Sequence, residues 1–181
     1  MTKTMADELL DLVDRNDRVI GKLWKSVAHK NPELIHREVA IIIYNDKGKV
    51  LFQKRSKSKK VNPGIWTESA AGHVPKGMKP IDAAHMELLE ELGFETKLKF
   101  FGKTLAHMPS ETHFTYWFVG EFPKGAKIKL QKDEVERVSF LSPQKLKKLI
   151  ESGETYDPQG TAGQPKDMVK EFWGKNKRIP K

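Results

Sequence analysis

Short apolar runs alternate with turn residues along the chain, and this pattern predicts several strands and a few helices. Residues 39–44 (VAIIIY) are apolar or aromatic and rich in β-branched side chains, which is typical of a strand buried on both faces. Residues 45–48 read as a polar turn, so residues 49–54 are expected to return as the second strand of a hairpin. Further strands are expected over residues 18–23, at Trp66, and over residues 96–106, 112–122 and 135–141.

The helices are marked by residues that suit helix ends. Pro80 fits a first helical turn, because its ring fixes φ and it has no N–H group to leave unpaired. Gly93 fits the left-handed position just after a helix, so a helix is expected over residues 80–92. The other expected helices are residues 143–150, which follow the N-cap Ser142, and a last short helix over residues 165–173.

The order of these elements indicates an α/β fold in which helices cover a mixed sheet. A chain of 181 residues is long enough to bury one full core, and no repeat divides it. One domain is therefore expected over residues 1–181. Its expected parts are an N-terminal extension (1–36) that packs on the sheet, a core (37–150), and a C-terminal loop with a short basic helix (151–181).

The composition excludes several classes of protein. A hydrophobic share of 38% with 31% charged residues is typical of a soluble globular protein. No apolar run approaches the roughly 20 residues that span a bilayer, and acidic residues stand where a signal peptide would be basic and then apolar. The expected location is therefore the cytoplasm, without a membrane partner. Because the chain has no Cys, disulfides, thiolate nucleophiles and thiolate metal ligands are excluded.

The net charge of +9, from 33 Lys and Arg against 24 Asp and Glu, favours anionic partners. Nucleic acid is disfavoured, because no nucleic-acid-binding motif is present. Arg55 and Lys59 lie between the hairpin and Trp66, where they would offer a fork-shaped and a point-like cation to a diphosphate. The alternative for these two cations is a position on a solvated loop. For Trp66 two roles remain open, a position in the core or stacking on a base.

Three carboxylates on the expected helix over residues 80–92 form the main candidate site. Glu87 stands three residues before Glu90 and four before Glu91, so the three side chains project from one side of the helix. Such acids repel one another, and a divalent cation that prefers oxygen ligands, Mg²⁺ or Mn²⁺, would relieve the repulsion. The alternative is a solvated acidic face, which is common on surface helices.

The stretch from residue 72 to 94 resembles the signature of the Nudix hydrolases, a Gly, then a Glu, then an Arg-Glu-apolar-x-Glu-Glu-x-Gly-apolar run. Met78 stands in place of the first Glu and Met86 in place of the Arg, so an apolar contact would replace the usual salt bridge. The matching positions are Gly72, Glu87, Leu88, Glu90, Glu91, Gly93 and Phe94. The resemblance implies an α/β/α sandwich, and metal-dependent catalysis by Glu87, Glu90 and Glu91 with the carbonyl of Gly72 as a further ligand.

The wider run from residue 11 to 91 resembles the branch of this superfamily that contains type I isopentenyl-diphosphate isomerase and its hydrolase-like relatives. In those isomerases three His and two Glu hold a divalent metal, and basic residues grip the diphosphate. The positions matched here are His29, His36, His73, Glu111 and His113 for the metal, and Lys25, Arg55 and Lys59 for the diphosphate. Such a nitrogen-rich second site would favour Zn, Mn or Ni over Mg, whereas the alternative is structural packing of the histidines.

The residues that carry the isomerase reaction are missing. In the isomerases a Cys before the Gly-His pair and a Glu on the facing strand transfer the proton, and Ala71 and His113 stand there instead. A methyl group cannot replace a thiol. The expected activity is therefore metal-dependent hydrolysis of a diphosphate linkage in a nucleoside diphosphate or a related small molecule. Two candidates remain open for the general base: one of the three helix carboxylates that does not bind the metal, or an acid from a neighbouring loop such as Glu111. The alternatives are an isopentenyl-diphosphate isomerase-like enzyme and a non-catalytic diphosphate-binding protein, and a homodimer remains open.

Overall fold

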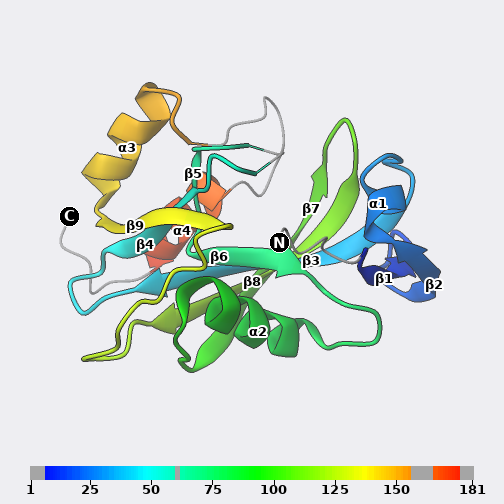
Figure 1. Cartoon of the computed structure of the whole chain (residues 1–181), viewed down its shortest axis with the longest axis horizontal. Helices are drawn as coiled ribbons and strands as arrows, with labels where there is room; N and C mark the ends of the chain where they lie inside the picture. Colours follow the sequence, from blue (N-terminus) through cyan, green and yellow to red (C-terminus); the bar gives the residue numbers. More distant parts are fainter. Residues whose placement is uncertain (1–6, 60–61, 156–164, 176–181) are drawn as a thin grey trace.

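A mixed sheet organises the part of the chain that this computed structural model describes, which is residues 7–59, 62–155 and 165–175 (Figure 1). Its nine strands in these residues are β1 (Leu9–Val13), β2 (Val19–Trp24), β3 (Ile35–Tyr44), β4 (Val50–Arg55), β5 (Trp66–Thr67), β6 (Ala70–His73), β7 (Leu98–His107), β8 (Thr112–Glu121) and β9 (Val135–Leu141). The helices are α1 (Lys25–Ala28), α2 (Pro80–Leu92), α3 (Pro143–Glu151) and α4 (Pro165–Lys175). β3 is parallel to β8 and antiparallel to β4 and β6, so the predicted α/β fold with a mixed sheet is confirmed.

Helices cover both faces of the sheet, because the long strand β3 sends apolar side chains to each face. Ile41 and Ile43 of β3 pack in one cluster with the apolar side of α2. Ala40 and Ile42 point the other way and pack in a second cluster with α3 and α4. In Figure 1, α2 lies on one side of the sheet and α3 and α4 lie on the other. All four residues are buried, as predicted for the run over residues 39–44. The result is the α/β/α sandwich that the sequence resemblance implies.

α2 begins and ends at the residues that the sequence predicts. Pro80 occupies the first turn, and Gly93 closes the helix with a φ of 73°, in the left-handed region that favours glycine. Leu88 and Leu92 are fully buried against the sheet. This packing fixes which side of α2 meets the sheet, and therefore where the three Glu side chains of the helix lie.

The N-terminal segment extends the sheet by strand pairing, whereas the sequence led us to expect an extension that packs on it. β1 and β2 form an antiparallel hairpin, and β1 joins the edge of β3 where Val13 pairs with Ile35. β1 was not predicted as a strand, because its five residues include an acid and follow two more acids. The short helix α1 follows β2 directly and leads the chain to the start of β3. This places Lys25 and His29 beside the sheet.

The loop expected in the C-terminal part (151–181) lies, over residues 156–164, outside the described residues. The flanking helices are described, and α3 and α4 extend one and two residues beyond the predicted ends at residues 150 and 173. Among the described residues, no helix is long and apolar enough to cross a membrane.

Candidate active site and metal centre

The three carboxylates of α2 differ in how far the sheet buries them. Glu91 is buried, Glu87 is half-buried and Glu90 is exposed. The side-chain amide of Gln53 on β4 donates a hydrogen bond of 3.0 Å to Oε2 of Glu91, and the backbone N–H of Ala71 donates to the same oxygen at 3.4 Å. Glu91 is therefore fixed between α2, β4 and β6, whereas Glu90 is held by none of these strands.

Glu87 lies directly against the backbone of β6. A Cβ atom built on Gly72 would lie 2.1 Å from Cδ of Glu87 and 2.1 Å from its Oε1, so the space that a side chain would occupy is filled by the carboxylate. Only glycine allows this approach without displacement of Glu87. The structure thus brings together Gly72 and Glu87, as the signature implies, and it adds Gln53 to the site.

Burial and mutual repulsion raise the pKa values of the two inner carboxyls. Burial is the main cause for Glu87, Glu90 adds to it, and the pKa rises to about 8. Burial and the neighbouring Glu87 raise the pKa of Glu91 well above its usual range, although the hydrogen bond from Gln53 opposes the shift. A cation nearby would favour the ionised forms of both. The donor set therefore suits a hard cation that takes oxygen ligands.

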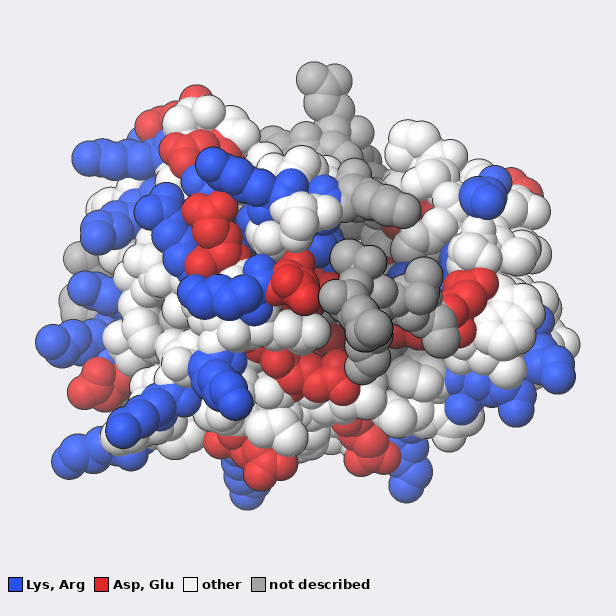
Figure 2. Space-filling model, viewed as in Figure 1, with Lys and Arg blue, Asp and Glu red and all other residues white. Residues whose placement is uncertain are grey.

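Figure 2 shows how charge is distributed on this side of the molecule. Asp and Glu side chains gather in the middle of the face, whereas Lys and Arg side chains lie beside them on the left half of the face and along the lower and right margins. An anionic substrate would therefore meet cations at the rim and would need a metal ion at the centre.

The two methionines of the altered signature are both partly buried. Met78 packs against the apolar cluster that contains Leu88 and Leu92, and Met86 on α2 is half-buried. The position of the first signature Glu is thus occupied by an apolar side chain that contacts the core.

A second polar cluster lies where α1 ends and where β3, β6 and β8 run side by side. His29 Nε2 is 2.8 Å from His73 Nε2 and 3.0 Å from Oε2 of Glu111. His73 Nε2 is in turn 3.1 Å from Oε1 of Glu38. Five side chains offer one ligand atom each within 4.8 Å of one another, namely His29, His36, Glu38, His73 and Glu111. We call this set the histidine centre, and its nitrogen and oxygen donors suit a transition metal or Zn²⁺.

His36 shows that hydrogen bonding within the described residues does not account for this cluster. Its side chain is fully buried, yet neither ring nitrogen has a hydrogen-bond partner. Oε2 of Glu111 lies 3.0 Å from Nε2 of His29 and 3.7 Å from Nε2 of His36, but neither contact has the geometry of a hydrogen bond. Buried polar atoms are nearly always paired, so unpaired atoms that converge on one point fit a bound ion.

The protonation of the histidines also suits metal binding. Burial is the main cause that lowers the pKa of His36 to about 3, and it lowers the pKa of His73 well below its usual range. Burial likewise lowers the pKa of His29, against the attraction of Glu111. These imidazoles are therefore neutral at pH 7, which is the form that binds metals.

Two residues of this cluster differ from the expectation. His113 is not one of the five converging residues, and its Nε2 instead faces Oε2 of Glu38 at 3.3 Å. Sequence reasoning missed Glu38 altogether. The available signal was its spacing from His36, because residues two apart on a strand share one face.

The three predicted diphosphate-binding cations lie in different surroundings. Lys25 Nζ is 3.0 Å from Oε2 of Glu8. The positive charge of Lys25 acts on both clusters. It lowers the pKa of Glu87, which burial raises, and it lowers the pKa of His73, which burial also lowers. Burial raises the pKa of Glu38 to about 7, and the charge of Arg55 opposes that shift. Lys59 is paired with Glu134. Lys25 and Arg55 are thus near the clusters, and Lys59 is engaged by an acid.

Trp66 lies away from both clusters. It is 6% exposed and packs in the apolar cluster on the face opposite α2. The guanidinium carbon of Arg137 lies 5.3 Å from the centre of its ring. The structure therefore places Trp66 in the core, and it does not bring this side chain to the carboxylates.

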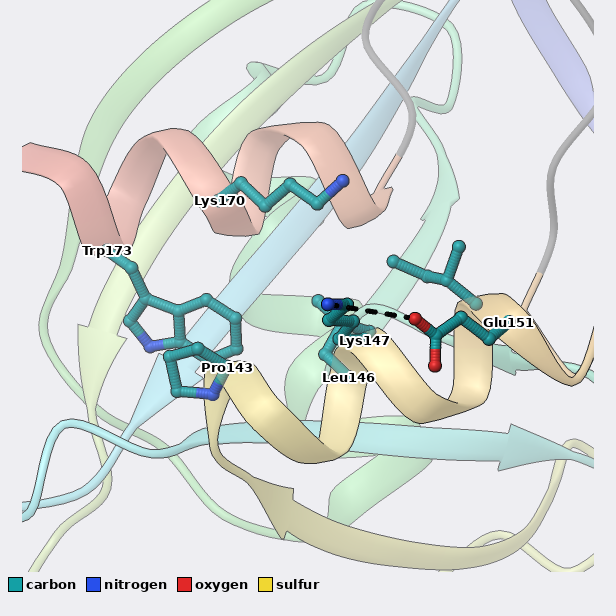
Figure 3. A pocket seen from close by; sticks show the side chains of 7 residues that line it. Pro143, Leu146, Lys147, Glu151, Lys170 and Trp173 are labelled. Atoms are coloured by element: carbon teal, nitrogen blue, oxygen red, sulfur yellow. Dashed lines mark ion pairs between the residues drawn. The ribbon is translucent and has the colours of Figure 1, made fainter. Parts of the chain in front are cut away.

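A cavity of about 440 Å³ lies between α3 and α4, on the other side of the sheet (Figure 3). Apolar side chains such as Leu146, Ile150 and Trp173 line it, and the ion pair between Lys147 and Glu151 at 3.8 Å lies at its side. None of the predicted site residues lines this cavity.

Comparison with known proteins agrees with the fold. The model of the NUDIX domain matches residues 34–159. Isopentenyl-diphosphate Delta-isomerase 2 of Photorhabdus laumondii is 36% identical over 149 residues, which cover 80% of this chain and 82% of that protein. The Nudix hydrolase lmo0368 of Listeria monocytogenes is 33% identical over 144 residues, which cover 80% and 85%. The crystal structure of DR0079 from Deinococcus radiodurans matches with a TM-score of 0.74 at 22% identity, over 91% of this chain and 98% of that one.

The structural match at 22% identity speaks for the fold alone. The family model and the two relatives also show family membership, because each match covers more than two thirds of the chain. The carboxylates of α2 and Gly72 all lie within the matched residues 34–159. The chain therefore belongs to the Nudix family, and it is a hydrolase of that family.

Proposed function

We propose that this hydrolase cleaves a diphosphate linkage in a nucleoside diphosphate or a related small molecule, where α2 meets β6. The observation that carries the proposal is that the half-buried Glu87 and the buried Glu91 lie side by side, with Gly72 leaving room for the carboxylate of Glu87. A cation relieves the repulsion between two such neighbouring carboxylates, and their oxygens suit Mg²⁺ or Mn²⁺. The proposed ligands are Glu87, Glu90, Glu91 and the carbonyl of Gly72. When bound, such an ion withdraws charge from phosphate oxygens and lowers the pKa of a coordinated water.

The residues of the chain have separate tasks in this proposal. Gln53 and the N–H of Ala71 hold the carboxylate of Glu91 in one orientation, which lowers the cost of ordering it when substrate binds. Glu90 is exposed, so its carboxylate is free to turn toward a substrate at the surface. Lys25 and Arg55 supply positive charge to the diphosphate. An acid that is not engaged as a ligand accepts the proton of the attacking water.

The proposal is tested by following phosphate and nucleotide products across a panel of nucleoside diphosphates and other diphosphates, with Mg²⁺ or Mn²⁺. We expect Glu91→Gln to lower the rate by about 100-fold or more, because the neutral amide no longer attracts a cation. Glu95→Gln is the matched control, since Glu95 is an exposed acid just beyond the helix. Equal background rates for the parent and Glu91→Gln on every substrate would refute hydrolysis at α2.

A second candidate function is isomerisation of isopentenyl diphosphate, favoured by the 36% identity to the Photorhabdus laumondii isomerase. The side chain of Ala71 on β6 offers no proton, and we therefore expect no conversion. Incubation with isopentenyl diphosphate followed by separation of the products distinguishes the two reactions. Tight binding of a diphosphate by calorimetry without turnover would instead indicate a binding protein.

A further inference from the structure

The two carboxylate oxygens of Glu38 face different partners. Oε1 lies 3.1 Å from Nε2 of His73, within the histidine centre. Oε2 lies 3.3 Å from Nε2 of His113, which is outside the set of converging ligands. Glu38 thus lies between the other residues of the histidine centre, which face its Oε1, and His113, which faces its Oε2.

Strand pairing on both sides fixes Glu38 in this place. It is opposite His73 of β6 and opposite Thr115 of β8 in the sheet register. His36 lies two residues earlier on the same face of β3, opposite His113. The rings of His36 and His73 stack at 5.3 Å between centroids with an interplanar angle of 15°. The donors are therefore held by backbone hydrogen bonding and ring contacts before any ion binds.

His113 has the surroundings of a residue that orients a ligand. It is 7% exposed, and its Nδ1 has no hydrogen-bond partner among the described residues. With a proton on Nε2 it donates to Oε2 of Glu38 and leaves Oε1 free to turn toward the centre. Carboxylate ligands of metals are commonly held by such an outer hydrogen bond, which sets their orientation.

The resemblance to the isomerases implies a divalent metal at the histidine centre. We infer that in this chain Glu38 is one of its ligands, beside His29, His36, His73 and Glu111, and that His113 positions Glu38 instead of binding the ion. The unpaired nitrogens of the fully buried His36 are the independent sign of a missing ligand. The inference assumes that this Nudix hydrolase uses metal, but it concerns a different set of side chains from the carboxylates of α2. Three nitrogen and two oxygen donors suit Zn²⁺ or Co²⁺ better than Mg²⁺.

Co²⁺ is the probe, because its visible spectrum reports the number and type of ligands. The metal-free full chain is titrated with Co²⁺ in a Glu91→Gln background, which removes binding at α2. We expect Glu38→Gln to weaken Co²⁺ binding by more than about 100-fold and to alter the spectrum. His113→Gln should weaken binding by about 10- to 100-fold and keep the spectrum, as expected when only an outer partner of a ligand changes.

Thermal unfolding of each metal-free variant shows whether it is folded, and Glu33→Gln, at an exposed acid before β3, serves as the control. Absence of a Co²⁺ spectrum in the Glu91→Gln background would overturn the inference. An altered spectrum for His113→Gln with an unchanged one for Glu38→Gln would overturn it as well, because it would make His113 the ligand. Hydrolysis lost in Glu91→Gln with Co²⁺ binding retained separates this inference from the proposed function.

Discussion

Gly72 and Glu87 are in such close contact that a Cβ atom at position 72 would fall within 2.1 Å of the carboxyl carbon of Glu87. The two residues lie on different elements, β6 and α2, so their contact sets the distance between the helix and the sheet at the site. Close-packed interiors do not absorb an added methyl group without displacement. The contact is therefore a structural requirement of the site as well as a feature of the signature.

The first prediction concerns this contact. Gly72→Ala should lower the free energy of unfolding by about 1 to 3 kcal/mol through overpacking, and should abolish most hydrolysis because it displaces Glu87. Adding Glu87→Ala removes the clash, so the double variant should regain stability without regaining hydrolysis. Chemical denaturation and product release measure the two effects. If the stability effects of the two substitutions simply add, the residues are not in direct contact.

The second prediction concerns Gln53, whose amide holds Oε2 of Glu91 at 3.0 Å. Gln53→Leu has a similar volume but no donor, so we expect Mn²⁺ affinity at α2 to fall by about 10- to 100-fold, as for other outer partners of a ligand. Electron paramagnetic resonance of free Mn²⁺ during a titration measures the affinity. Gln144→Leu, at an exposed position of α3, should leave it unchanged. An unchanged affinity in Gln53→Leu would exclude an orienting role for this amide.

The parts of the fold that depend on local chemistry were predictable from the sequence. α2 was predicted over residues 80–92 because Pro80 and Gly93 mark helix ends without help from the rest of the chain. β3 was recognised because a strand buried on both faces reads as one apolar run. The position of Glu87 near Gly72 came from the resemblance to the Nudix signature.

The parts that depend on distant pairing were not predictable. Glu38 belongs to the histidine centre only because β3 runs between β6 and β8, and sequence spacing does not show strand order. Trp66 was assigned to a substrate site or the core, and the pairing of β5 with β4 turns it to the face opposite α2. His113 was expected as a ligand from its position in the resemblance, whereas its ring faces Glu38.

The third prediction concerns Lys25, which lies at the start of α1 beside Glu8 with 29% of its side chain exposed. Lys25→Met should raise KM for a diphosphate substrate by about 10- to 100-fold, as expected for the loss of a hydrogen bond to a charged group, with a smaller change in kcat. Steady-state kinetics separate the two constants. Lys22→Met, at an exposed position of β2, is the control. Equal effects of both substitutions would reduce the role of Lys25 to general surface charge.

The fourth prediction concerns Asp17, which joins the N-terminal hairpin to three other strands. Its carboxylate accepts a hydrogen bond of 2.6 Å from Nε of Arg37, one of 2.8 Å from Nζ of Lys103, and one from the hydroxyl of Tyr116. Burial opposes ionisation of Asp17, but the hydrogen bonds from Lys103, Tyr116 and Arg37 outweigh it and lower its pKa. This network holds the hairpin that carries the chain to Lys25 and His29.

A lowered pKa fixes the sign of the pH dependence. The folded state binds fewer protons at Asp17 than the unfolded state, whose Asp groups have a pKa of about 3.9, so the stabilisation is complete above that pH. It is lost as the pH falls through the lower pKa of the folded state. Asp17→Asn should therefore cost about 2 kcal/mol or more of unfolding free energy at pH 7, and progressively less below pH 4.

Asn is the suitable replacement, because residue 17 has a φ of 63° and Asn tolerates this left-handed conformation. Urea denaturation of the parent and of Asp17→Asn between pH 7 and pH 2 measures the difference. Asp46→Asn, at an exposed turn residue, should show no such pH-dependent gap. A gap that stays constant down to pH 2 would mean that the substitution acts through the backbone of the turn. A gap that closes with acid would show that the charge of Asp17 secures the hairpin.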